Sequence, residues 1–252
     1  MDVNQLFDVS GKVVCVTGAS SGLGRSAASF LAMAGARVVG VARRQDQLEA
    51  WRDETDGETE AVVADLSEKS TLSNVAAEVA QPFGPPDILI NAAGMNTRQH
   101  ADDVSAADWD KTIGINLSAP FFLAQALVGN MKEKRWGRVI NFASLQSRRA
   151  FSNGLSYGAS KGGVEQLTRA MAEAWSNSGI TANALAPGFF RTELTSTVFD
   201  DPVLSKRNAD QTCIGRNGEP SDLNGSLMYF CSPASDYVTG QVLFVDGGFT
   251  AK

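Results

Sequence analysis

The sequence predicts an α/β protein, a single domain built on a doubly wound, seven-stranded parallel sheet. Short β-branched and aliphatic runs alternate with longer amphipathic stretches along the 252 residues, and this alternation is typical of strand–helix–strand units. The runs are apolar throughout rather than at every second residue, which indicates strands buried on both faces. With 43% hydrophobic and 20% charged residues, a chain of this length can bury one large core.

Each expected strand is a short run rich in Val, Ile, Leu or Ala, and each expected helix shows apolar residues at helical spacing. In chain order the strands are Val13–Thr17, Arg37–Ala42, Ala61–Val63, Ile88–Asn91, Arg138–Phe142, Thr181–Ala186 and Val242–Val245. The helices lie near Arg25–Ala34, Glu68–Ala80, Asp108–Met131 and Ser156–Ser178. Right-handed crossovers then place helices on both faces of the sheet. No linker or repeat divides the chain, so we expect one domain over residues 1–252.

The longest stretch without a predicted strand runs from Gly188 to Gly240. It contains loop-like and helical pieces before the last strand. Long insertions of this kind often cover binding sites. We therefore expect residues 189–218 to form a lid over the substrate.

Composition excludes several partners. The net charge is −6 and the basic residues are scattered, which argues against nucleic acid as a partner. No apolar run approaches the roughly 18–20 residues that cross a bilayer, and the acidic start "MDVNQLFDVSGK" is no signal peptide. We therefore expect no membrane partner. The three cysteines show no paired spacing and are expected to be reduced thiols in a cytoplasmic protein.

A single histidine, His100, limits the available chemistry. A Ser-His-Asp hydrolase would have to use it, and a zinc dehydrogenase would lack ligands. We therefore expect no metal site. His100 lies in the polar segment "TRQHADD", where a solvent-exposed loop residue is expected and a substrate contact is the alternative. If the protein is an enzyme, its acid–base group is expected to be another residue type.

The stretch "VVCVTGASSGLGRSA" places three glycines, Gly18, Gly22 and Gly24, between the first strand and a helix. In an open parallel sheet, ligands bind beyond the carboxyl ends of the strands. A helix start offers free N–H groups and partial positive charge, which suit a pyrophosphate. The doubly wound sheet with this turn predicts a Rossmann-type fold. The spacing is G-x-x-x-G-x-G rather than G-x-G-x-x-G, so a purely structural turn is the alternative for this motif alone.

The second strand, "ARVVGVARR", ends in basic residues. In dinucleotide-binding folds an acidic residue near this point accepts hydrogen bonds from the adenosine ribose. Here Arg43 and Arg44 follow the strand. Guanidinium groups can bind a 2′-phosphate that a carboxylate would repel. This favours NADP(H) over NAD(H), the alternative being that both arginines are solvated residues at a helix start.

The segment "SYGASKGGVEQLTRAMAEAW" carries a candidate acid–base pair. Tyr157 and Lys161 are four residues apart and therefore lie on one face of the predicted helix. A nearby ammonium favours the phenolate and lowers the tyrosine pKa. Ser144 ends the preceding strand segment "RVINFAS", where its hydroxyl can bond a carbonyl oxygen while Tyr157 transfers the proton. Alone, Tyr-x-x-x-Lys is a weak signal.

Together these motifs resemble the short-chain dehydrogenase/reductase family over essentially the whole chain. The resemblance rests on "TGASSGLG", "NAAG", "INLSAPF", "YGASK", "APGFFRT" and "VDGG", together with Ser144, in the order typical of the family. It implies an NAD(P)-dependent oxidoreductase that interconverts a secondary alcohol and a ketone, with the catalytic residues Asn116, Ser144, Tyr157 and Lys161. By resemblance, Tyr157 is the general acid/base, Ser144 holds the reacting oxygen, and Lys161 lowers the tyrosine pKa and contacts the nicotinamide ribose. Asn116 would kink its helix and hold a water linked to Lys161.

The resemblance also implies a cofactor site. Asp65 and Leu66 match positions that contact adenine, Asn91, Ala92 and Gly94 match the side of the adenine ribose, and Thr192 matches the residue that holds the carboxamide. The expected cofactor-binding residues are Gly18, Ser20, Ser21, Gly22, Leu23, Gly24, Arg43, Asp65, Leu66, Asn91, Ala92, Gly94, Tyr157, Lys161, Pro187, Gly188 and Thr192. Many NADP-dependent relatives carry a basic residue where this chain has Ser21. Phosphate recognition would therefore rest on Arg43, with Arg44 or Ser20, and NAD(H) remains possible.

The substrate is less clearly specified. "GMNTRQ" and "SLQSRRAF" place Arg98, Gln146 and Arg149 after two strand ends, and arginines there suit a carboxylate; surface or subunit contacts are the alternative. Within the family the chain resembles the gluconate 5-dehydrogenase and 2-deoxy-gluconate 3-dehydrogenase branch, which favours a sugar acid or polyol. The runner-up is a 3-oxoacyl thioester or bulky cyclic ketone, whose apolar pocket would be lined by Phe151, Phe189, Phe190 and Phe199. A nucleotide-binding regulator without turnover is a further alternative. The family resemblance implies a homotetramer.

Overall fold

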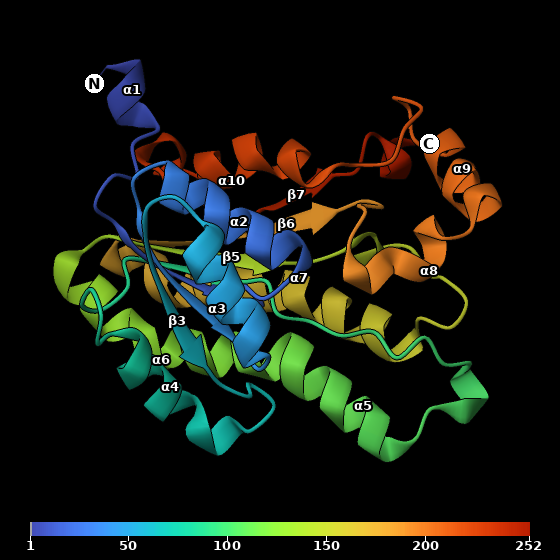
Figure 1. Cartoon of the computed structure of the whole chain (residues 1–252), viewed down its shortest axis with the longest axis horizontal. Helices are drawn as coiled ribbons and strands as arrows, with labels where there is room; N and C mark the ends of the chain where they lie inside the picture. The colour runs from blue at the N-terminus through green and yellow to red at the C-terminus, as the bar shows by residue number, and fades with distance from the viewer. Residues whose placement is uncertain (1) are drawn as a thin grey trace.

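The computed structural model describes residues 2–252 and confirms the predicted fold class. Within that range seven strands form one all-parallel sheet in the order β3-β2-β1-β4-β5-β6-β7 (Figure 1). Crossing from β3 to β4 changes the direction of winding, as in a doubly wound fold. The strands are β1 Val13–Thr17, β2 Arg37–Ala42, β3 Glu58–Val63, β4 Ile88–Asn91, β5 Gly137–Phe142, β6 Ile180–Pro187 and β7 Val242–Val245.

Helices cover both faces of the sheet. In Figure 1, α2, α3 and α10 lie on one side and α4, α5, α6 and α7 on the other, while α8 and α9 belong to the segment before β7. The helices are α1 Val3–Leu6, α2 Gly22–Met33, α3 Gln45–Glu54, α4 Leu72–Val79, α5 Ala106–Ile113, α6 Ala119–Lys134, α7 Leu155–Trp175, α8 Ser196–Phe199, α9 Pro202–Asp210 and α10 Asn224–Cys231.

Sequence patterns missed helices α1, α3 and α10 and half of one strand. Helix α3 is almost entirely polar and buries only Leu48 and Trp51, so its apolar signal is short. Helix α10 lies within Gly188–Gly240, the stretch without a predicted strand, where no helix bounds were predicted. The first half of β3, "ETE", is polar, which an edge strand that pairs only with β2 can accommodate. An edge strand shows a weaker apolar run than a central one.

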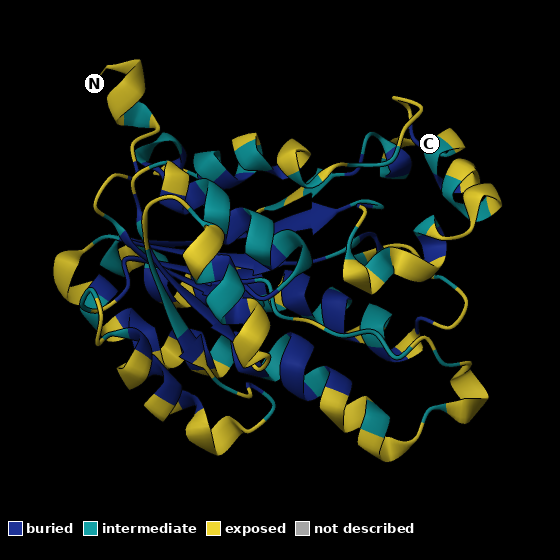
Figure 2. Cartoon of the chain, in the orientation of Figure 1, coloured by how far each residue is buried: buried dark blue, intermediate teal, exposed yellow. Residues whose placement is uncertain are grey.

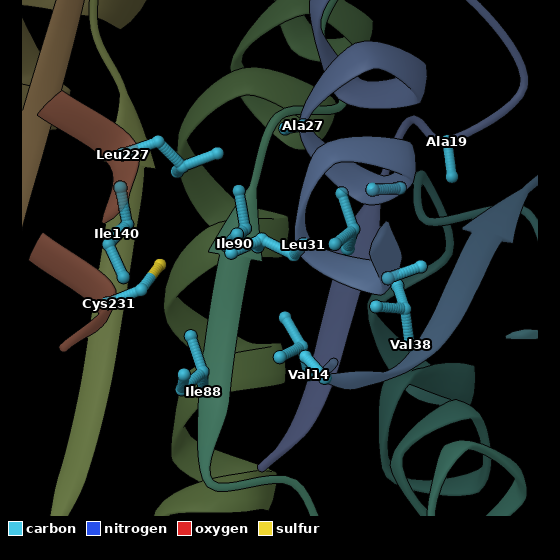
Figure 3. Close-up of a cluster of buried hydrophobic side chains, with 14 of the residues drawn as sticks. Val14, Ala19, Ala27, Leu31, Val38, Ile88, Ile90, Ile140, Leu227 and Cys231 are labelled. Carbon is cyan, nitrogen blue, oxygen red and sulfur yellow. The ribbon is translucent and has the colours of Figure 1, made fainter. Parts of the chain in front are cut away.

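Each face of the sheet has its own buried core. One core joins the upper face of the central strands to α2, α3 and α10; Figure 3 shows Val14, Ile90 and Ile140 of the strands against Leu31 of α2 and Leu227 of α10. The other core joins the opposite face to α4, α6 and α7. Figure 2 shows the result, with buried strands at the centre and exposed residues on the outer helix faces and around α8 and α9.

The predicted helix over Asp108–Met131 is one continuous helical stretch with a π-helical turn. Helix α5 passes through this turn, Gly114–Ser118, directly into α6. The whole stretch, Ala106–Lys134, is long and apolar enough to cross a membrane, although no such run was expected from the sequence. However, 56% of its most apolar window is buried within the protein, and α6 packs on α4 and β5. Core packing therefore accounts for its composition.

The strand register brings the ends of the central strands to one edge. Thr17 of β1 pairs with Asn91 of β4, Asn91 pairs with Asn141 of β5, and Phe142 pairs with Leu185 of β6. The loops that follow these strands therefore emerge side by side. That edge carries the chemistry-bearing motifs found in the sequence.

Candidate active site

The turn after β1 contains glycines at positions where a Cβ atom would collide with neighbouring backbone. Gly18 has φ +76°, and a Cβ there would lie 2.9 Å from the backbone of Ala93. A Cβ on Gly24 would lie 2.4 Å from the carbonyl oxygen of Gly18. Both positions therefore require glycine, one for its conformation and both for the close approach of neighbouring backbone.

The turn opens a helix whose start is free to bind an anion. Ser21 is the N-cap of α2, but its side chain makes no capping hydrogen bond. The first N–H groups of a helix have no partner within the helix itself. The 12-residue helix α2 therefore presents donors and a partial positive charge at the carboxyl edge of the sheet. A pyrophosphate fits this feature.

A cleft of about 650 Å³ runs along the edge from this turn to the end of β6. It brings together most of the predicted site residues. Of the predicted set, the following line it: Gly18, Ser20, Ser21, Gly22, Leu23, Gly24, Arg43, Asp65, Leu66, Ala92, Gly94, Arg98, Ser144, Gln146, Tyr157, Lys161, Pro187, Gly188 and Thr192.

Asn116 lies in the π-helical turn and fastens two neighbouring segments. Its Oδ1 accepts from the N–H of Met95 at 2.9 Å, and its Nδ2 donates to the carbonyl of Met95 at 2.9 Å. The same Nδ2 donates to Ser160 Oγ at 3.0 Å. Asn116 is buried, so all three bonds are made away from water. Asn116 thereby links the loop after β4 to Ser160 on α7, the residue that directly precedes Lys161.

Ser144 and Tyr157 form the centre of the cleft. Ser144 Oγ accepts from the N–H of Gln146 at 3.1 Å, which leaves its proton free to point toward Tyr157 or a ligand. Burial raises the pKa of Tyr157 above its ordinary value, and the hydrogen bond with Ser144 and the positive charge of Arg98 act in the opposite direction. The net direction is upward, so the phenol is protonated at neutral pH.

Lys161 is buried beside the tyrosine. Its Nζ lies 5.7 Å from the centre of the Tyr157 ring and donates to the carbonyl of Phe142 at 2.5 Å. Burial lowers the pKa of Lys161 to about 8. The net pKa shift of Tyr157 is upward, opposite to the lowering expected from Lys161, because burial outweighs the groups that oppose it, Ser144 and Arg98. Burial of both groups explains this, because it disfavours each charged form.

Arg98 is held in an unusual conformation at the rim. Its φ is +52°, a left-handed conformation that is uncommon for residues other than glycine. Asn96 Oδ1 accepts from its N–H at 3.1 Å, and its Nη2 donates to the carbonyl of Leu194 at 2.7 Å. Gln146 faces the same space, and its buried Oε1 has no hydrogen-bond partner among the described residues. The rim thus offers the Arg98 guanidinium, whereas the Oε1 of Gln146 lies beneath the surface beside Gly154.

An aromatic cluster lies beside the cleft, and two of its three rings line it. Phe151, Phe189 and Phe249 lie with ring centres 5.7–6.3 Å apart. Of the four phenylalanines named for the alternative apolar pocket, Phe151, Phe189 and Phe190 line the cleft. Phe199 instead lies beneath Arg191, whose guanidinium carbon is 4.8 Å from the ring centre.

Three predicted site residues, Asn91, Arg149 and Asn116, do not line the cleft. Asn91 is buried in the sheet, where its Nδ2 donates to Asn141 Oδ1 at 2.9 Å, so its side chain ties β4 to β5. Arg149 lies over the ring of Phe249, 5.7 Å from its centre. His100 is exposed and accepts from the N–H of Asp102; it is a loop residue, as expected. The catalytic candidate Asn116 lies behind the lining, as described above.

The basic residues after β2 differ from each other. Arg43 is 55% exposed and 4.0 Å from Asp65. Arg44 crosses to the far lip of the cleft, where its two Nη groups donate to the carboxylate of Glu193 at 2.7 and 2.9 Å. Arg44 Nη2 also donates to Ser21 Oγ at 2.7 Å.

Sequence reasoning missed Glu193 and Ser160. Glu193 lies in the strandless insertion, and nothing in its local pattern indicates a contact 149 residues away. Ser160 could have been found, because it stands within "YGASK", next to Lys161. Its Oγ donates to the carbonyl of Tyr157 at 2.7 Å while accepting from Asn116. Segment 189–218, for which a lid was expected, contributes Phe189, Phe190 and residues 192–197 to the cleft lining.

The fold and the cleft define a dinucleotide-binding protein of the Rossmann type. The chain matches the enoyl-(acyl carrier protein) reductase family over residues 18–250. It is 37% identical over 250 residues to gluconate 5-dehydrogenase of Gluconobacter oxydans (strain 621H), covering 98% of each chain. It is 36% identical to galactitol 2-dehydrogenase (L-tagatose-forming) of Cereibacter sphaeroides, covering 99% of each.

Among solved structures, it resembles a gluconate 5-dehydrogenase from Burkholderia cenocepacia J2315 in complex with NADP and tartrate. The TM-score is 0.93 at 35% sequence identity, and 100% of each chain is covered. The chain therefore belongs to the short-chain dehydrogenase/reductase family, as its motifs indicated.

The side chain of Asn91 gives a first test. We expect Asn91→Ala to lower the free energy of unfolding by about 1–3 kcal/mol, because Asn141 loses a buried partner. The dissociation constant of the cofactor should change by less than about twofold, since the side chain points into the sheet. Chemical denaturation and cofactor fluorescence measure the two quantities. Asn183→Ala in β6, another buried asparagine with two hydrogen bonds, is the control for stability. Weakened cofactor binding with unchanged stability would contradict this assignment.

Proposed function

We propose that this protein is an NAD(P)-dependent oxidoreductase that interconverts a secondary alcohol and a ketone on a sugar acid or polyol. One observation carries the proposal: Ser144 and Tyr157, a hydroxyl pair suited to a carbonyl oxygen, lie in the same cleft as Arg98 and an uncapped helix start. The similarity to gluconate and galactitol dehydrogenases over nearly the whole chain supports the same reaction class.

The glycine turn, the helix start and the ends of the strands would hold the cofactor. Gly18, Gly22 and Gly24 would admit the pyrophosphate, Asp65 and Leu66 would contact the adenine, and Thr192 with the Pro187–Gly188 turn would bound the nicotinamide side. We favour NADP(H), because Arg43 and Arg44 stand where the adenosine 2′-phosphate is expected. The solved relative with NADP supports this choice. NAD(H) is the alternative cofactor.

The protein's own groups would manage the proton and the oxygen. A bound nicotinamide cofactor supplies or accepts the hydride. In reduction, Ser144 donates a hydrogen bond to the ketone oxygen and Tyr157 gives its proton to that oxygen as the alcohol forms. In oxidation, the tyrosinate takes the alcohol proton. Lys161, buried beside the ring, stabilises the tyrosinate by its positive charge when protonated, and Asn116 with Ser160 fixes the lysine's segment.

Arg98 and Gln146 would recognise the rest of the substrate. The guanidinium of Arg98 can form charge-assisted hydrogen bonds with a carboxylate, and the side chain of Gln146, which lines the cleft and whose Oε1 has no partner among the described residues, would turn toward a substrate hydroxyl. A polyhydroxy acid offers both groups. Residues 189–218 would act as a lid, because their first part lines the cleft and Arg98 holds Leu194.

We further propose a cytoplasmic homotetramer. Trp109, Phe122 and Leu155 are large apolar residues that remain exposed on α5, α6 and α7. We take these exposed apolar side chains as support for a subunit interface that includes these three helices. The buried thiols Cys15 and Cys231, whose pKa values burial raises to about 12, suit a reducing compartment.

A second candidate substrate is a bulky or acyl-chain ketone. The aromatic cluster of Phe151, Phe189 and Phe249 is the observation that favours it, since such a wall can bury an apolar chain. The same residues can instead pack against one another as a fixed wall beside a polar substrate. The two candidates use the same proton chemistry and differ only in the group that occupies the rim.

Initial rates on a substrate panel test the proposed function. We expect turnover of gluconate or a related sugar acid or polyol, faster with NADP(H) than with NAD(H). Tyr157→Phe should lower kcat by about 10²–10⁴-fold, because the proton carrier is lost. Unchanged cofactor binding by this variant controls for folding. Turnover only of 3-oxoacyl thioesters or cyclic ketones would favour the second candidate, and a variant as active as the wild type would contradict the mechanism.

The pKa of Tyr157 predicts opposite pH dependence for the two directions. Because burial raises this pKa, the proton donor is present at neutral pH and the proton acceptor forms only in alkali. We expect kcat/KM for oxidation to rise from about pH 6 to about pH 10, and that for reduction to be flat at first and then fall. Initial rates at substrate concentrations well below KM, with saturating cofactor at each pH and samples returned to neutral pH to exclude inactivation, measure this. An oxidation rate that falls with rising pH would contradict it.

A further inference from the structure

Arg44 is already bound to an anion of the protein itself. Its guanidinium donates in a bidentate arrangement to Glu193, at 2.7 and 2.9 Å. Bidentate pairing with a planar carboxylate uses the same N–H groups that recognise a phosphate. Hydrogen bonds from Arg44 and Ser21 hold the pKa of the Glu193 carboxyl below its ordinary value, so the glutamate is ionised at neutral pH.

The ion pair stands at the phosphate end of the cleft. Arg44 follows β2, and its Nη2 also donates to Ser21 Oγ at 2.7 Å and to Ser20 Oγ at 3.4 Å. Ser21 directly precedes Gly22, at the position where many NADP-dependent members of the family carry a basic residue. Arg44 therefore supplies a positive charge at that position from a different element, and Glu193 neutralises it.

The pair is accessible enough to exchange partners. The side chain of Arg44 is 41% exposed and that of Glu193 is 61% exposed. Ion pairs this open to water are weak, because solvent screens them. A phosphate monoester carries more negative charge than a carboxylate, so it can displace Glu193 from Arg44. The displaced carboxylate would then lie near the phosphate and repel it.

We infer that Glu193 determines the cofactor preference by competing with the 2′-phosphate of NADP(H) for Arg44. The inference rests on the proposed cofactor site and adds a residue to it. NAD(H) carries no 2′-phosphate and does not contend for the guanidinium. Glu193 therefore lowers the affinity for NADP(H) but not that for NAD(H), and the difference between the two affinities becomes smaller. Arg44, which the sequence suggested as a ligand for the 2′-phosphate, is thus partly neutralised by Glu193, 149 positions away in the chain.

Equilibrium binding of NADPH and NADH, followed by their fluorescence, tests the inference. Glu193→Gln keeps the size of the side chain and removes the charge. We expect it to tighten NADPH binding by about fivefold, the strength of an exposed ion pair, and to change NADH binding by less than about twofold. The matched control is Asp200→Asn, which removes an exposed negative charge from the same segment and should leave both affinities unchanged. Arg44→Met should weaken NADPH binding and leave NADH binding nearly unchanged.

The outcomes separate this inference from the proposed cofactor. Equal changes for NADPH and NADH in Glu193→Gln would overturn the inference, because they would indicate a general effect of the segment on the cleft. Weaker NADPH binding in that variant would overturn it as well. If the wild type binds NADH alone, the NADP(H) preference fails; a gain of NADPH binding in Glu193→Gln would then still support the competition, and no gain would overturn it.

Discussion

Three hydrogen bonds made by Asn116 connect the segments that carry the candidate catalytic residues. They join the loop after β4, through both backbone groups of Met95, to Ser160 on α7. Asn116 can reach both because α5 widens into a π-helical turn before α6, and such turns are frequent at functional sites. Ser160 in turn donates to the carbonyl of Tyr157. The tyrosine and lysine are therefore positioned from a neighbouring helix rather than by their own helix alone.

Burial of ionisable groups at the sheet edge then sets the chemistry. Burial raises the pKa of Tyr157 and lowers the pKa of Lys161. Both changes favour the neutral form of the side chain. Ser144 and Arg98 act in the opposite direction on the tyrosine. Arg98 thus affects the reacting end of the cleft as well as its rim, and its contact with Leu194 links both to the segment that carries Glu193.

Much of this arrangement could be predicted from the sequence. The strands were recognised because central parallel strands are apolar on both faces, and the glycines and the Tyr–Lys spacing carry their own stereochemistry. Helix α3 was missed because only Leu48 and Trp51 are buried on it. The role of Asn91 as a link between strands and the pairing of Arg44 with Glu193 depend on tertiary contacts, which no local pattern records. The direction of the Tyr157 pKa was misjudged for the same reason, since burial is a property of the fold.

The central claim is that Ser144 and Tyr157 hold one end of a sugar acid while Arg98 holds its carboxylate. The most direct test compares kcat/KM for gluconate and for an uncharged polyol in Arg98→Met, with Arg149→Met as the control outside the cleft. The account predicts a loss of about 10–100-fold for gluconate, the worth of a charge-assisted hydrogen bond, and a much smaller loss for the polyol. Equal losses for both substrates would contradict it, because Arg98 would then act only through Tyr157 or through its contact with Leu194.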